Sequence, residues 1–443
     1  MNLLGAVLIL ATCSVVLVAR SRRWACLALI AGTLYVTQGQ GITIGGFSIF
    51  STRIFEIAAT IRIIARRELA PSRWVRLDKL VLLSYLVPAV IYCLRTADQR
   101  AYAIGRCVDG ILAYTIFRSL VTDLDDFLWL LGSLAVLLVP YAAIVLREHR
   151  TGLSPWFGMG GLDTAMTWTR HGVPRCEGSF RHPSLLGTLG ASFLPLYIAM
   201  IQAKLKRRMA WAGIVACVTI VWEANSGGPV CFVGIVLVGW LLWRLRAKMY
   251  LIRRALVATL VLTAIVMKAP IWFIFDRMGD ITGGDGWHRS ELIDQAVRTI
   301  GHWWLWGMDI SRTADWFAYQ LGTGVADICD MYVALGLQAG VLAIALFVTM
   351  LVVAFKQVGR ALAAAREDAL GRPPGMECFL WGLGVMLAGH IFNWFAITYF
   401  DQTYVIWSLQ LAALAALCQQ AQSLPVQFTS SPNVAEPAVL QVS

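Results

Sequence analysis

Long apolar runs separated by short polar segments make up most of the chain. We interpret about thirteen of these runs as membrane spans, because an α-helix needs roughly 20 apolar residues to cross a bilayer. The sequence therefore predicts an all-α polytopic membrane protein with about 12–13 transmembrane helices. The expected spans are residues 2–19, 24–39, 43–64, 80–96, 101–119, 127–146, 184–203, 209–224, 228–244, 252–270, 329–354, 376–398 and 402–420.

Two segments are too long and too polar to lie in lipid, at about residues 147–183 and 271–328. We expect both to be extended loops that contain short helices. The second carries a Gly-rich turn at residues 283–286, and a helical pattern follows it. The apolar residues of that pattern recur at the spacing of one helix face; they are Leu292, Ile293, Ala296 and Ile300.

Composition supports a membrane protein without a large soluble domain. Of the 443 residues, 58% are hydrophobic and only 14% are charged, whereas a soluble chain carries roughly 25% charged residues. We expect one transmembrane domain over residues 1–420 and a disordered cytoplasmic tail over residues 421–443. We expect no cleavable signal peptide, because the first basic cluster follows the first apolar run instead of preceding it.

The net charge of +11 is distributed in clusters that abut the ends of the apolar runs. This is the positive-inside pattern of membrane proteins, so we expect contact with membrane lipid and not with nucleic acid. The alternation of spans then places both long loops on the outer side. The clusters are Arg20, Arg22 and Arg23; Arg66, Arg67, Arg73, Arg76 and Lys79; Lys204, Lys206, Arg207 and Arg208; Arg244, Arg246, Lys248, Arg253 and Arg254; and Lys356, Arg360, Arg366 and Arg372.

Ionisable residues inside the expected spans either pair with each other or line a polar cavity for an anionic ligand. Arg53 and Glu56 lie three residues apart, as do Arg106 and Asp109. That spacing predicts two ion pairs, each on one helix face. The ten Cys show no CxxC or Cys/His set of the kind that binds metal, and we expect neither a metal ion nor a cofactor.

The first long loop ends in a basic segment just before an expected helix. Arg175 and Arg181 precede Pro183, which marks the helix start. Guanidinium groups at a helix N-terminus suit phosphate, because their donors match phosphate oxygens in pairs. The alternative is that these Arg side chains only extend to the membrane interface.

The motif that begins at Arg175 resembles the first signature of the O-antigen ligase and O-antigen polymerase superfamily. It reads Arg175-x2-Gly178-x-Phe180-x2-Pro183-x3-Gly187. The second signature corresponds to the turn at residues 225–228, where Gly227 stands in place of the usual Arg.

Two further signatures follow in the family's order, and the resemblance covers about residues 170–345. The third consists of Arg289, Leu292, Ala296, Ile300 and Gly307, with Trp304 where Pro is usual. The fourth is Cys329-Asp330-Met331-Tyr332-Val333 followed by Gly340, with Cys329 where His or Asp is usual.

The resemblance implies a metal-independent, inverting glycosyltransferase in the bacterial inner membrane, with its active site facing the periplasm. Its donor would be a glycan on undecaprenyl diphosphate. Its acceptor would be a hydroxyl of lipid A-core, of another glycan or of a further molecule, in lipopolysaccharide or exopolysaccharide synthesis. An O-antigen polymerase, which joins lipid-linked repeat units, is the alternative within the family.

The resemblance also implies roles for individual residues. Arg175, Arg181 and Arg289 would bind the diphosphate, where negative charge develops as the lipid leaves. Asp330 would be catalytic together with Arg289, by orienting the acceptor hydroxyl or accepting its proton. Asp330 also suits the N-cap of the following helix. Three residues are further candidates for the base or for acceptor contacts: Asp327, His288 and Tyr332.

Two other classes of protein stay open from the sequence. A transporter of lipid-linked glycans would use the same cationic residues without chemistry, and it would show paired broken helices in two repeats. A metal-dependent glycosyltransferase would carry an acidic motif in an early outer loop, and the connection at residues 38–46 has no acid.

Cys176 and Cys329 lie within or beside the signatures, on the side where disulfides persist if the topology is right. One hypothesis is a disulfide between them that ties the two parts of the site together. The alternative is two unrelated thiols.

Overall fold

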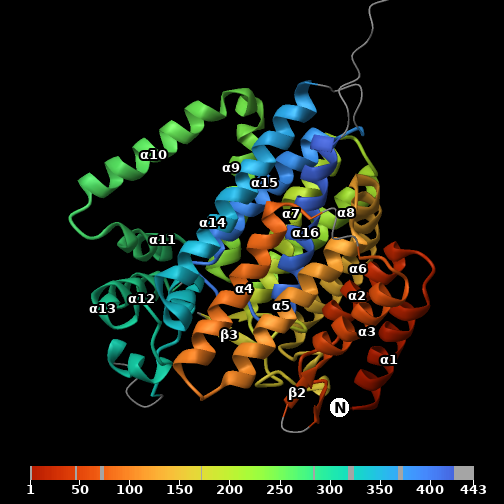
Figure 1. Ribbon diagram of the computed structural model, residues 1–443, viewed down its shortest axis with the longest axis horizontal. Coiled ribbons are helices and arrows are strands. Elements are labelled where there is room, and N and C mark those ends of the chain that lie inside the picture. Colours follow the sequence, from red (N-terminus) through yellow and green to blue (C-terminus); the bar gives the residue numbers. More distant parts are fainter. Residues whose placement is uncertain are drawn as a thin grey trace, which may run out of the picture.

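The computed structural model describes residues 2–44, 47–69, 74–170, 172–282, 285–317, 324–367 and 373–423. Most of the described chain is helical (Figure 1). The α-helices are α1 (Leu3–Val18), α2 (Arg22–Tyr35), α3 (Ser51–Ala65), α4 (Arg76–Arg95), α5 (Arg100–Leu120), α6 (Leu124–Thr151), α7 (Pro183–Gln202), α8 (Arg207–Ala224), α9 (Gly227–Leu241), α10 (Met249–Val266), α11 (Ile274–Thr282), α12 (Gly286–Arg298), α13 (Ile300–Trp303), α14 (Met331–Glu367), α15 (Met376–Asn393) and α16 (Gln402–Ser423).

Short elements lie between these helices. Two antiparallel hairpins pair β1 (Gly41–Ile44) with β2 (Phe47–Phe50) and β3 (Trp168–Arg170) with β4 (Val173–Arg175). Four 3-10 segments are η2 (Phe157–Met159), η3 (Leu242–Lys248), η4 (Ile271–Phe273) and η5 (Ile310–Trp316).

Six helical segments of the described chain are long and apolar enough to cross a membrane, by length and composition. The protein is therefore an all-α membrane protein with several candidate spans. The six are Arg76–Arg95, Leu124–Thr151, Pro183–Gln202, Gly227–Val266, Met331–Glu367 and Gln402–Ser423.

Each segment that the sequence predicts to span contains a helix, but two of them differ from expectation. Residues 43–64 begin in the β1–β2 hairpin, and α3 starts only at Ser51. The β-branched and aromatic residues of that stretch favour strands. Residues 283 and 284 of the expected turn and residues 424–443 of the expected tail fall outside the described residues. Helix α16 continues to Ser423.

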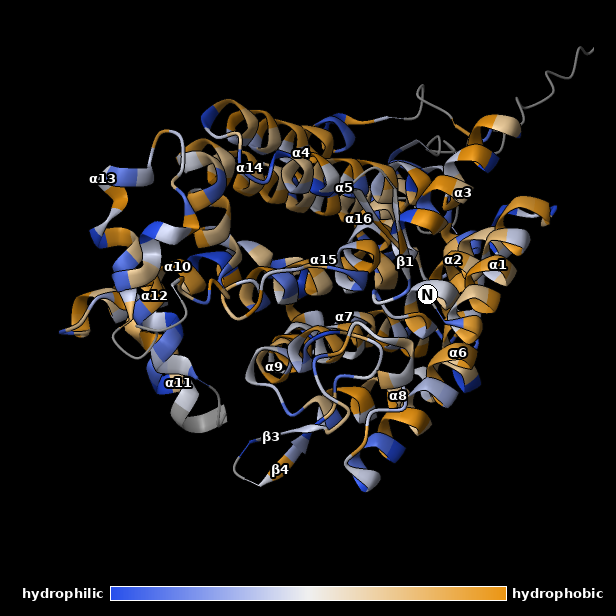
Figure 2. Ribbon diagram, turned by 90° about the horizontal axis from the view of Figure 1, so that it is seen from below, coloured by the Kyte–Doolittle hydropathy of each residue, from blue (hydrophilic) through white to orange (hydrophobic). Residues whose placement is uncertain are grey.

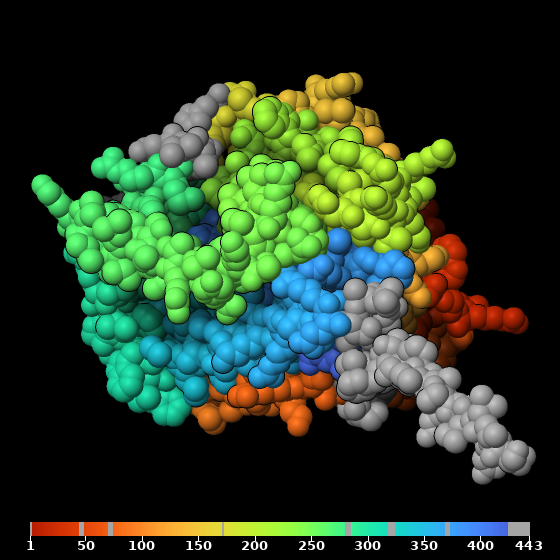
Figure 3. Space-filling view, turned by 90° about the horizontal axis from the view of Figure 1, so that it is seen from above, coloured from red at the N-terminus to blue at the C-terminus, as the bar shows by residue number. Residues whose placement is uncertain are grey.

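The second difference concerns α10, which has no buried residue. It stands apart from the bundle at the upper left of Figure 1. From above, its chain arches over a hollow beside the other helices (Figure 3). An apolar helix with no buried residue suits contact with lipid tails.

Helix α7 lies at the centre of the bundle, between α8, α9 and α15 (Figure 2). Nearly all of its residues are buried. Small residues allow this close packing, because a Cβ at Gly187 would lie 2.6 Å from the Pro229 side chain of α9. Since the first signature ends within the first turns of α7, the centre of the bundle fixes the position of the loop that precedes this helix.

The helices end at two chemically different ends of the bundle. At one end, which we call the basic end, Arg23 pairs with Asp126 and Arg118 pairs with Asp78. At the opposite end, which we call the loop end, lie both hairpins and the helices α11–α13 (Figure 1). The basic clusters and the signature motifs therefore occupy opposite ends.

The segment between α10 and α14 forms a second, smaller hydrophobic core against the start of α14. Leu292 and Ala296 of α12 pack there with Trp303, Trp316 and Val333. Trp303 and Trp316 are thus core residues, whereas Trp304 and Trp306 are exposed. The third and fourth signatures meet in this small core.

Two signature glycines allow that contact. Gly340 has φ 74° and ψ −171° and interrupts the helical backbone of α14. A Cβ there would lie 2.5 Å from the carbonyl oxygen of Leu305. Gly307 has φ 75°, and the next N–H, of Met308, donates to the Leu337 carbonyl over 2.8 Å. The chain at the end of the third signature therefore packs against α14 at the break in its helical backbone.

We predict that Gly340→Ala destabilises the protein by on the order of 1–3 kcal/mol, because Ala is strained at this backbone conformation and its Cβ collides with a carbonyl. The matched control is Gly359→Ala in the same helix, where a Cβ meets nothing within 4 Å. Thermal unfolding of the two variants in detergent should give a lower Tm for the first alone. Equal Tm values would contradict the role of the break.

Candidate functional site

The loop that carries the first signature is held by buried hydrogen bonds from α6. The Glu148 carboxylate accepts the N–H groups of Glu177 and Gly178 over 3.0 and 3.1 Å. Gly178 has φ 58°, and a Cβ there would lie 2.6 Å from the Tyr141 hydroxyl. These contacts fix the turn that separates Arg175 from Arg181.

Arg175 and Arg289 converge at the loop end, although they belong to different signatures. Arg175 ends β4, and Arg289 lies on the first turn of α12. The pKa of Arg175 is lowered to about 10, first by burial and then by the guanidiniums of Arg170 and Arg289, while Asp285 acts in the opposite direction. The two signatures thus place like charges within electrostatic reach of each other.

His182 lies within electrostatic reach of Arg175 and Arg289. Its Nδ1 accepts the N–H of Ser184 and caps α7, so its proton is carried on Nε2. The pKa of His182 is lowered to about 4 by burial and then by Arg175 and neighbouring guanidiniums. The imidazole is therefore neutral at pH 7 and can act as a hydrogen-bond donor.

Buried polar atoms without a partner mark this region. The Nε atoms of Arg175 and Arg289 and the Oδ2 atom of Asp330 are buried without a hydrogen bond to any described residue. Arg170, by contrast, pairs with Asp285 over 2.5 Å. Buried polar groups in folded proteins almost always have partners, so these three atoms are candidates for contacts with a ligand.

Asp330 is fully buried and caps α14. Its Oδ1 accepts the N–H of Val333 over 2.9 Å. Burial raises the pKa of Asp330 to about 7. The backbone N–H groups of Val333 and Tyr332 and the charge of Arg289 act in the opposite direction. The N-cap role expected from the sequence is confirmed, and the remaining oxygen is poised to exchange a proton near neutral pH.

His288 and Cys329 lie beside Asp330 and Arg289. The Cys329 Sγ is 3.7 Å from Nδ1 of His288, whose ring stacks on Phe317 with centroids 4.6 Å apart. Burial lowers the pKa of His288, an effect that Asp327 opposes. Asp327 itself is exposed, so it acts on His288 from the protein surface.

Two residues predicted for the site have partners other than Arg175 and Arg289. Arg181 points to a different side of the loop and pairs with Asp401 over 2.7 Å, because the Gly178 turn reverses the chain between Arg175 and Arg181. The Tyr332 hydroxyl donates to the Ile391 carbonyl over 3.2 Å. The expected clamp of three Arg therefore reduces to Arg175 and Arg289.

Arg181 lines a cavity of about 400 Å³ between α4, α5, α14 and α16. Arg53 and Asp109 also line it, and they pair across two helices through bonds of 2.6 and 2.7 Å. The predicted same-helix pair of Arg53 with Glu56 is wrong, because Glu56 accepts from the Tyr404 hydroxyl instead. An ion pair and a cavity therefore occur together here, and the two charges of the Arg53–Asp109 pair come from different helices.

The proposed disulfide between Cys176 and Cys329 is wrong. Both are free thiols, and they have different neighbours. Cys176 donates to the Val145 carbonyl over 3.6 Å, whereas Cys329 faces His288.

We call Arg175, Arg289 and the side chains within electrostatic reach of them the cationic cluster. Sequence reasoning missed its members Arg170 and His182, and it missed Asp285, which pairs with Arg170. Arg170 lies on the strand that pairs with β4, and a hairpin signal between these residues would have placed it near Arg175. His182 immediately precedes the helix-starting Pro183, which is an N-cap position.

A comparison of the chain with models of known protein families finds no match, and a comparison with curated proteins finds none either.

Proposed function

We propose that this protein is a membrane glycosyltransferase of the O-antigen ligase type. It transfers a glycan from undecaprenyl diphosphate to an acceptor hydroxyl in lipopolysaccharide or exopolysaccharide synthesis. In this proposal the chain crosses the bacterial inner membrane 12–13 times. The loop end faces the periplasm, because the basic clusters gather at the opposite end, as expected for cytoplasmic ends.

One observation carries the proposal: two half-buried guanidiniums, each with an unpartnered Nε, lie near each other. Neither forms an ion pair with any described residue. Gathering like charges away from water is costly unless an anion compensates them. A diphosphate supplies two or more negative charges and oxygens that suit the guanidinium fork.

The reaction requires little beyond that clamp. The acceptor oxygen forms a bond to the anomeric carbon while the bond from that carbon to the diphosphate oxygen breaks. Negative charge then grows on the diphosphate, where the guanidiniums of Arg175 and Arg289 stabilise it. The Nε2–H of His182 adds a neutral donor beside them.

The proton of the acceptor hydroxyl needs a base, and Asp330 is the best-placed carboxylate. Its pKa near 7 matches a group that accepts a proton at neutral pH. Asp330 is buried, so the acceptor reaches it only when the surrounding segment moves. His288 and Asp327 are the further candidates for this step.

The acceptor fits the cavity that Arg181 lines. Its volume of about 400 Å³ is in the usual range for small-molecule sites. Met331, which follows Asp330 in the chain, is part of its wall. The start of α14 therefore lies between the cationic cluster and this cavity, with Asp330 at the boundary.

We predict that Arg289→Lys and Arg175→Lys each reduce kcat/KM for glycan transfer by about ten- to a hundredfold, because Lys keeps the charge but loses the paired hydrogen bonds. The matched control is Arg298→Lys on the same helix as Arg289, where the side chain is 71% exposed and pairs with Asp294. A transfer assay with purified protein and lipid-linked donor measures both. Full activity in the two site variants would refute the clamp.

We predict that Asp330→Asn lowers the rate of transfer while leaving the fold intact, because Asn caps a helix nearly as well as Asp. As a base, Asp330 is active when deprotonated, so wild-type activity should rise as the pH rises through about 7. The variant should lack that rise, and Asp327→Asn should keep it. A variant with wild-type rates and pH profile would show that Asp330 only caps α14.

Deletion of the gene in its host separates the three functions that share this site. Long glycan chains without an acceptor indicate a lost ligase, and single capped repeats indicate a lost polymerase. Glycan that stays on the cytoplasmic face indicates a lost transporter and would contradict the proposed chemistry.

A further inference from the structure

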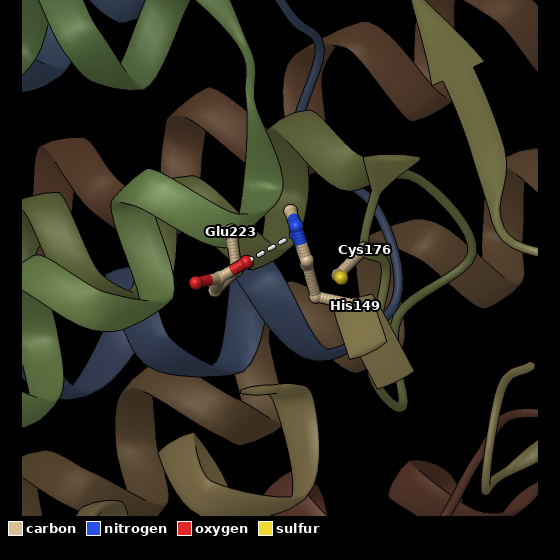
Figure 4. Close-up of side chains that lie close together, drawn as sticks. All are labelled: His149, Cys176 and Glu223. Atoms are coloured by element: carbon tan, nitrogen blue, oxygen red, sulfur yellow. Dashed lines mark ion pairs between the residues drawn. The ribbon is translucent and has the colours of Figure 1, made fainter. Parts of the chain in front are cut away.

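A second group of chemically active side chains lies at the loop end, outside the cationic cluster. His149 comes from the last turn of α6, Cys176 from the first signature, and Glu223 from the last turn of α8. Their ligand atoms all lie within 4.8 Å of one another. Figure 4 shows the three side chains pointing toward one another from three separate segments.

We propose that His149, Cys176 and Glu223 form a zinc site that fastens the first signature to the ends of α6 and α8. Imidazole nitrogen, thiolate sulfur and carboxylate oxygen are the three ligand types that zinc takes in proteins, usually in tetrahedral geometry. Three protein ligands leave a fourth position for water. The mixture of soft and hard donors disfavours magnesium and calcium, which bind oxygen.

Two of the three side chains already contact each other. Nδ1 of His149 and Oε2 of Glu223 lie 2.5 Å apart and form the ion pair marked in Figure 4, which a zinc ion bound between them would replace. Glu223 is only 6% exposed. A tetrahedral zinc ion holds its donor atoms about 3.3–3.7 Å apart. Zinc binding would therefore widen the 2.5 Å separation of His149 and Glu223, and the His149 side chain is 33% exposed.

The charges around the thiol also favour a cation. The buried thiol of Cys176 lies among the carboxyl groups of Glu148, Glu223 and Glu177. The Oε1 atom of Glu177 is itself buried without a hydrogen bond. Zinc would offset the Cys176 thiolate and the Glu223 carboxylate, so the metal and its three ligands carry no net charge.

The backbone already holds two ligands in place. The N–H of Cys176 donates to the carbonyl of Glu223 over 2.9 Å. The neighbouring Glu148 carboxylate holds the two residues that follow Cys176. Such supporting contacts orient metal ligands. Because Cys176 directly follows Arg175, the metal would restrain the guanidinium that we place in the diphosphate clamp.

The zinc site is tested on the full-length protein in detergent, without any glycan substrate. We expect about one equivalent of zinc per chain by elemental mass spectrometry. With cobalt as the probe, we expect a thiolate-to-metal charge-transfer band in the ultraviolet. Zinc should also raise the Tm of the metal-free protein.

Single substitutions decide which residues hold the metal. His149→Asn, Glu223→Gln and Cys176→Ser should each weaken zinc binding at least about tenfold, and Cys176→Ser should abolish the charge-transfer band. The control is Cys217→Ser, a buried thiol on the same helix as Glu223, which should bind zinc like the wild type.

If the variants at the buried positions fail to fold, His149→Asn still tests the site. The His149 side chain is 33% exposed, so its substitution disturbs the core less. A wild-type protein that binds no zinc, or an unchanged affinity in His149→Asn, would overturn the proposal. The measurement involves no glycan donor, so its failure leaves the proposed transfer reaction untouched.

Discussion

The convergence of two like-charged guanidiniums is the constraint on which the loop end depends. Arg175 and Arg289 repel each other, and burial lowers the pKa of Arg175 further. A fold tolerates such an arrangement only where other contacts determine it. The contacts on both sides of the pair are therefore what hold the two guanidiniums near each other.

Each guanidinium is held by a different support. The Arg175 side rests on the carboxylate of Glu148 and on the fully buried helix α7 that follows the loop. The Arg289 side rests on the small core of α12 against α14, where the break at Gly340 admits the chain around Leu305. Because the two supports consist of different residues, a substitution that disrupts one support displaces only the cation that it holds. The other support stays folded.

The sequence predicts the helical class well because apolar runs report directly on membrane spans. Many of their ends are close to expectation, but α14 continues to Glu367, well past the expected end at residue 354, and the β1–β2 hairpin replaces the first residues of another expected span. The resemblance implies that Arg175 and Arg289 bind one diphosphate, which requires the two side chains to lie near each other. Periodicity alone contains no information about that contact.

The errors have a common physical cause, which is that pairing across helices is invisible in local spacing. Arg53 has Glu56 three residues away, yet its partner is Asp109 on α5. Arg181 follows Arg175 closely in the chain, yet the left-handed backbone at Gly178 sends it to Asp401. In both cases a local rule was overridden by tertiary packing that one sequence does not reveal.

The cluster of His149, Cys176 and Glu223 illustrates the same limit for metal sites. Sequence signals for zinc rely on ligands at short, regular spacing, and these three come from two helix ends and a loop. Their position links the two proposals physically. The chain that carries Cys176 also carries Arg175, so a metal at the one would reduce the conformational freedom of the other. Such restraint matters most where a buried cation must stay in place before its anion arrives, since preorganised charge needs no rearrangement at the moment of reaction.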